Sequence, residues 1–124
     1  MHGLHLTADL YGCACDAALQ TDADRLGALC LQAVADAGLQ AVAQLFHTFP
    51  ASVHGPGGVT ATVLLAESHL CVHTWPETAA VTLDVYVCNF GGYHSAKAHA
   101  LMAALRGLFK PAGCTLNQLE RGAL

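Results

Sequence analysis

The chain has 124 residues, of which 54% are apolar and only 11% are charged, and its mean hydropathy is +0.43. Typical domains have roughly 45–50% apolar and about 25% charged residues, so this composition excludes a disordered chain. No apolar run approaches the ~18 residues of a membrane-spanning helix. The five basic residues are scattered, which argues against a nucleic-acid partner. We therefore expect a single domain over residues 1–124, with surplus apolar surface that an oligomer would bury.

The N-terminus has neither a basic stretch nor the long apolar stretch of a secretory signal, so a cytoplasmic location is expected. Six cysteines in such a location indicate buried small hydrophobic side chains or a catalytic thiol rather than disulfides.

Apolar periodicity and turn residues predict the elements in chain order. Alternation predicts strands at 3–11, 40–49, 59–66, 69–75, 79–88 and 114–120. Helical spacing predicts two helices, over 21–37 with Gly38 as its stop, and over 95–109 before Pro111. Proline and glycine mark a loop at 51–58. The order β-α-β-β-β-β-α-β predicts an α+β fold, a two-layer sandwich with both helices on one face of an antiparallel-rich sheet.

Chemically active side chains concentrate in residues 67–77, Glu-Ser-His-Leu-Cys-Val-His-Thr-Trp-Pro-Glu. Because alternate strand residues share a face, His69, Cys71 and His73 would lie together and could suggest a zinc or copper site. Residues two apart in a strand are ~6.6 Å apart, however, which makes such a metal-binding module a distant alternative. Hydrolysis through Ser68 is disfavoured because the G-x-S-x-G motif is absent.

Four segments together resemble the prokaryotic S-adenosylmethionine decarboxylases, which are pyruvoyl-dependent enzymes. They occur in the family's order and span nearly the whole chain. The segments are Gly3 to Cys13 (GLHLTADLYGC), Phe46-His47-Thr48-Phe49, Ala66 to Leu70 with His73-Thr74-Trp75-Pro76-Glu77, and Asp84 to Cys88 (DVYVC).

This resemblance implies a self-processing proenzyme. Ser68 would attack the carbonyl of Glu67, and a hydroxyl at Thr60 would stabilise the tetrahedral intermediate. His73 would then remove the Ser68 α-proton as a general base. The products would be a β chain of residues 1–67 and an α chain of residues 68–124.

The resemblance also implies how a processed enzyme would act. The covalent cofactor would be the pyruvoyl group derived from Ser68, with no pyridoxal phosphate and no metal, and the substrate amine would form a Schiff base with it. Cys88 would return a proton after CO₂ is lost. Phe49 would stack on adenine and Glu77 would bind the ribose hydroxyls. Further expected substrate contacts are Trp75, Leu4 and Leu70.

The implied partners are S-adenosylmethionine and a second copy of the chain, in a homodimer of αβ units with sites close to the subunit interface. The implied product is an aminopropyl donor for spermidine synthesis. Three features depart from the family: Thr60-Ala61 replaces a more usual Ser-Gly pair, the loop at 50–58 is several residues longer than in compact members, and Asn89 follows Cys88 where glycine is common. Because relatives with the same machinery decarboxylate arginine or ornithine, these are the alternative substrates, although Phe49 and Glu77 favour the nucleoside.

Overall fold

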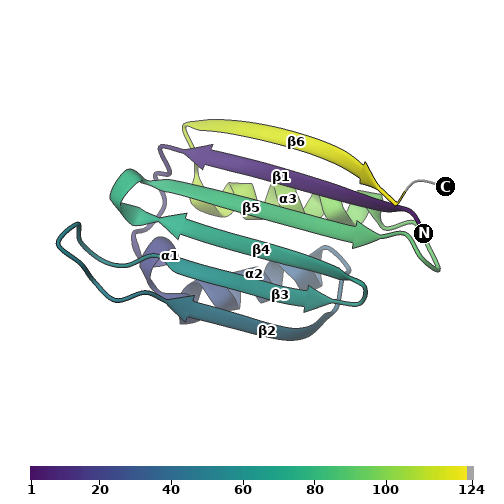
Figure 1. Ribbon diagram of the computed structural model, residues 1–124, viewed down its shortest axis with the longest axis horizontal. Coiled ribbons are helices and arrows are strands. Elements are labelled where there is room, and N and C mark those ends of the chain that lie inside the picture. Colours follow the sequence, from purple (N-terminus) through teal and green to yellow (C-terminus); the bar gives the residue numbers. More distant parts are fainter. Residues whose placement is uncertain (123–124) are drawn as a thin grey trace.

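A computed structural model describes residues 1–122 and contains a six-stranded sheet with the order β2-β3-β4-β5-β1-β6 (Figure 1). All neighbouring strands are antiparallel. The strands are β1 (Gly3–Tyr11), β2 (Ala41–Thr48), β3 (Val59–Leu65), β4 (Ser68–Trp75), β5 (Ala80–Cys88) and β6 (Gly113–Arg121). The helices are α1 (Ala18–Thr21), α2 (Ala23–Asp36) and α3 (Ser95–Phe109), with a 3-10 turn η1 (Pro76–Thr78). The predicted two-layer α+β sandwich is confirmed, and α1 and η1 are additions that the sequence pattern did not predict.

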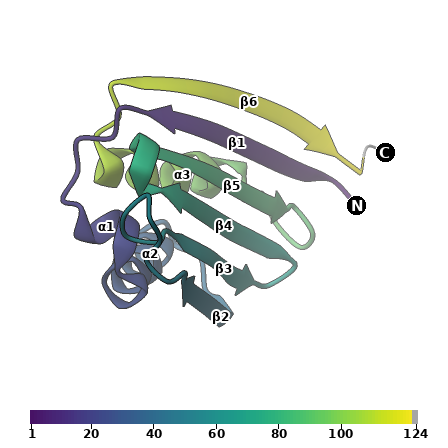
Figure 2. The ribbon, with the colours of Figure 1, turned by 60° about the vertical axis from the view of Figure 1, so that its left-hand side comes forward.

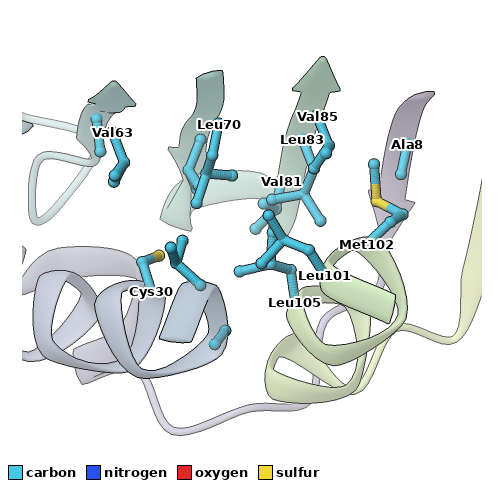
Figure 3. Packing of buried hydrophobic residues seen from close by; sticks show 14 of the residues in the cluster. Ala8, Cys30, Val63, Leu70, Val81, Leu83, Val85, Leu101, Met102 and Leu105 are labelled. Atoms are coloured by element: carbon cyan, nitrogen blue, oxygen red, sulfur yellow. The ribbon is translucent and has the colours of Figure 1, made fainter. Parts of the chain in front are cut away.

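The helices α2 and α3 cover one face of the sheet (Figures 1 and 2). Alternate residues of the inner strands point at them, and in β5 the side chains of Val81, Leu83 and Val85 are fully buried. Figure 3 shows these valines and leucines packed over Leu101 and Leu105 of α3. The opposite side chains form a face without helices, called here the open face, to which Thr60, Thr62, His69, Cys71, His73, Asp84 and Tyr86 belong.

The helix predicted over 21–37 begins later in the structure, where α2 starts at Ala23. The backbone of Asp22 is extended, so Thr21 ends α1, and the Asp22 carboxylate accepts the Asp24 N–H at 3.0 Å to begin α2. At the other end Gly38 has a φ of +80° and stops the helix, as the sequence predicted. Within residues 1–122 no helix is long and apolar enough to cross a membrane.

Candidate active site

Glu67 lies in a two-residue turn that joins β3 to β4. Leu65 pairs with Ser68, so only Ala66 and Glu67 form the loop. The φ of Glu67 is +55°, a left-handed conformation that costs a non-glycine residue ~1–2 kcal/mol. The favoured hairpin turns have a positive φ at the first loop residue, whereas here only the second has one. The peptide bond between Glu67 and Ser68 therefore follows a strained residue.

Ser68 begins β4 beside the end of β5. Its Oγ accepts the backbone N–H of Cys88 at 3.1 Å, and Cys88 itself is buried. The structure thus brings Glu67, Ser68 and Cys88 together, as expected for adjacent strands. A cavity of about 540 Å³ opens here, called the Ser68 cavity. It is lined by Val42, Leu64, Leu65, Glu67, Ser68, His69, Tyr86 and Arg121.

A cluster of aromatic and ionisable side chains surrounds His69 on the open face. The His69 ring lies 5.6 Å from that of Tyr86 and 6.2 Å from that of His5. Burial lowers the pKa of His69 below its ordinary value of 6.5, and His5 lowers this pKa further, while Asp84 opposes the shift. The His5 Nε2 is 3.6 Å from the Asp84 carboxylate. These surroundings favour the neutral form of the His69 ring.

The second group of predicted residues lies at the other end of β4. Thr60 Oγ1 and His73 Nδ1 are 3.2 Å apart across the β3–β4 pair. They border a cavity of about 270 Å³, called the His73 cavity. Its lining consists of Phe49, Ser52, His54, Pro56, Gly57, Gly58, Thr60, His73, Thr74, Trp75 and Glu77. Sequence reasoning treated His54 and its neighbours only as loop residues, because nothing in a Pro/Gly-rich stretch indicates which cavity it will border.

The Ser68 cavity and the His73 cavity are separated by the length of β4. Five residues of strand place Ser68 and His73 about 16 Å apart. A general base must lie within ~2.6–3.2 Å of its partner, or reach it through one water. Within one subunit, therefore, the structure does not bring His73 or Thr60 to the Glu67–Ser68 bond.

Two of the expected substrate contacts, Leu70 and Leu4, are buried outside the two named cavities. Leu70 is 0% exposed and lies on the helix-facing side of β4, in the core (Figure 3). Leu4 is also buried on the helix-facing side, and it lines a third cavity of about 130 Å³ beside Gly3 and Ser95, outside the two named cavities. Both residues alternate with open-face histidines, so the strand pleat directs their side chains toward the helices. Their role is core packing.

The alternative metal site does not assemble. His69, Cys71 and His73 do share the open face, as the alternation predicted. Among residues 1–122, however, no group of three histidine, cysteine, aspartate or glutamate side chains is arranged to hold a metal ion.

Comparison with known proteins places this chain and its fold in the class of S-adenosylmethionine decarboxylases. The chain matches the model of the S-adenosylmethionine decarboxylase family over residues 4–122 and belongs to that family. It is 35% identical over 121 residues to the S-adenosylmethionine decarboxylase proenzyme of Picrophilus torridus, covering 98% of this chain and 85% of that protein. It is 37% identical over 122 residues to the proenzyme of Persephonella marina, covering 98% and 84%. The crystal structure of the adenosylmethionine decarboxylase from Aquifex aeolicus superposes with a TM-score of 0.83 at 34% identity, covering 98% of this chain and 92% of that one.

Proposed function

We propose that this chain is a self-processing decarboxylase that removes CO₂ from S-adenosylmethionine with a pyruvoyl group made from Ser68. The observation that carries the proposal is the Ser68 hydroxyl held on the Cys88 N–H at 3.1 Å, directly after the strained Glu67, in a chain of this family. The single domain is then cut into residues 1–67 and residues 68–124.

The proposal requires a second subunit. Both cavities border the open face, and the ~16 Å between Ser68 and His73 prevents their direct reaction within one subunit. A twofold dimer with its open faces in contact would bring His73 of the partner subunit to Ser68, and the reverse. Such a contact would also bury the exposed open-face side chains Leu45, Leu64 and Leu119, which are 73%, 47% and 57% exposed. The dimer therefore accounts for both the divided site and the apolar surplus of the chain.

Processing then proceeds with the residues in these positions. The Ser68 Oγ attacks the Glu67 carbonyl carbon, the peptide C–N bond breaks, and an ester forms. The partner's His73 removes the Ser68 α-proton, and the Glu67 carboxylate leaves as the Cβ–O bond breaks. Hydrolysis of the resulting dehydroalanine releases ammonia and leaves the ketone.

The Thr60–His73 hydrogen bond fits this scheme in one tautomer. When the His73 Nδ1–H donates to Thr60 Oγ1, the His73 Nε2 is free to accept the α-proton. The Thr60 hydroxyl then keeps its own proton, which it can donate to the tetrahedral oxyanion. One hydrogen bond thus supports the roles proposed for both side chains.

Turnover uses the same two cavities. The pyruvoyl group supplies an electron sink for the electrons left when CO₂ departs. The Cys88 thiol donates a proton to the substrate α-carbon, and its place beside Ser68 suits that task. In the partner's His73 cavity, Phe49 stacks on adenine and Glu77 accepts hydrogen bonds from the ribose. At about 270 Å³ this cavity is smaller than the ~300–1,000 Å³ of typical ligand sites, so a substrate must extend into the Ser68 cavity.

Mass spectrometry of the purified protein tests processing. We expect two chains divided between Glu67 and Ser68, and one intact chain in Ser68→Ala.

Release of CO₂ from S-adenosylmethionine, arginine and ornithine, assayed in parallel, tests the substrate. Activity only with an amino acid would overturn the nucleoside assignment, and an uncut wild-type chain after long incubation would overturn self-processing.

A further inference from the structure

The loop of residues 50–58 is held at both its base and its tip. At the base, the Phe49 N–H donates to the Gly58 carbonyl at 2.9 Å. At the tip, Ser52 and Gly55 exchange backbone hydrogen bonds of 2.8 and 3.1 Å. The Ser52 Oγ also accepts the His54 N–H at 3.1 Å. These contacts hold the backbone at His54, whose side chain is exposed.

His54 borders the same cavity as Phe49 and Glu77. The ring of Phe49 is contacted edge-to-face by His47 at 4.7 Å. The other histidine of the cavity, His73, is engaged by Thr60, whereas no hydrogen bond to the His54 ring is present within residues 1–122. His54 is thus an aromatic side chain on the cavity wall with no task in the fold.

We propose that His54 is a substrate-binding residue that contacts the adenine ring from the loop side of the His73 cavity. This inference rests on the proposed function and adds a residue to it. A flat aromatic ring binds a nucleobase by stacking, and arginine or ornithine offers no such partner. His54 therefore favours a nucleoside substrate over a basic amino acid.

Steady-state kinetics of His54→Ala, His54→Phe and a control, Val53→Ala, test the proposal. Val53 is 98% exposed at the same loop tip, so its truncation leaves the cavity unchanged. We expect His54→Ala to raise KM for S-adenosylmethionine about 5- to 30-fold with kcat within about twofold, the loss expected for one stacking contact. His54→Phe, which keeps a ring, should stay within about threefold of the wild type. All three variants should be cleaved as the wild type is.

Binding of methylthioadenosine to the uncut Ser68→Ala protein, with and without His54→Ala, separates this inference from the proposed function. That ligand carries the adenosyl group but cannot be decarboxylated. Weaker binding of methylthioadenosine to the His54→Ala variant supports the contact, whether or not the wild type is active. Absence of CO₂ release from S-adenosylmethionine by the wild type would overturn only the proposed activity. Unchanged KM and unchanged binding would overturn the His54 contact, as would equal losses in His54→Ala and His54→Phe.

Discussion

One hydrogen bond joins Ser68 and Cys88, and it is formed by a side-chain group of one residue and a backbone group of the other. Ser68 contributes its side-chain oxygen, whereas Cys88 contributes its backbone N–H and leaves the thiol free for another task. The Ser68 hydroxyl, the proposed nucleophile, is thus positioned by a group that substitution of the Cys88 side chain does not remove. Processing and turnover should therefore be separable at this position.

Cys88→Ala should still be cleaved, because the N–H that holds Ser68 Oγ remains. Decarboxylation should fall by ~10²-fold or more, the usual contribution of a positioned proton donor. Mass spectrometry measures the first effect and CO₂ release the second. Cys114→Ala, which removes an exposed thiol on β6, is the control and should leave both unchanged. A Cys88→Ala chain that stays uncut would show that the thiol itself takes part in processing.

His69 should make folding stability depend on pH. Its pKa is lowered in the folded state, so below the ordinary value of 6.5 the unfolded chain binds more protons than the folded one. Stability should therefore fall as the pH drops from 7 to 5. In urea unfolding of the uncut Ser68→Ala protein, His69→Gln should reduce that fall. The groups facing His69 are His5, Asp84 and Tyr86. An equal fall of stability with and without His69→Gln would show that these groups, and not His69, cause the pH dependence.

At the scale of elements, periodicity predicted most of the architecture. Alternation along residues 79–88 and 69–75 correctly indicated which side chains face the helices and which face away. It could not predict that β1 lies between β5 and β6, because the order of strands depends on long-range pairing. Leu70 has a different explanation, because it alternates with His69 and Cys71 along β4 and so faces the helices. The separation of Ser68 from His73 was implicit in strand geometry once both were placed on β4.

The loop base at Gly58 should be far more sensitive to substitution than a glycine in a helix. A methyl group at Gly58 would collide with the Thr74 carbonyl oxygen, whereas one at Gly107 in α3 meets open space. In the uncut Ser68→Ala protein, Gly58→Ala should lower the free energy of unfolding by about 1–3 kcal/mol. Gly107→Ala should raise it by about 0.5–1 kcal/mol. Urea unfolding measures both, and a neutral Gly58→Ala would show that the loop base can move.

At the scale of the whole molecule, the divided site predicts complementation between two inactive variants. Ser68→Ala lacks the proposed nucleophile, and His73→Ala lacks the proposed base. In a mixed dimer, Ser68 of the His73→Ala chain would meet intact His73 of the partner subunit. Co-expression should therefore restore cleavage, and only in the His73→Ala chain, which a mass tag identifies. If both residues act within one subunit, no mixture will be cut.

The position of β1 in the sheet has a consequence for the cut protein. The fragment 1–67 carries β1, β2 and β3, and the fragment 68–124 carries β4, β5 and β6. In the sheet, β1 is enclosed between β5 and β6, while β3 borders β4. The two fragments are therefore interleaved, and separating them would break three strand interfaces. A chain cut between Glu67 and Ser68 would therefore stay together, and once denatured it would have to reassemble from two molecules instead of one.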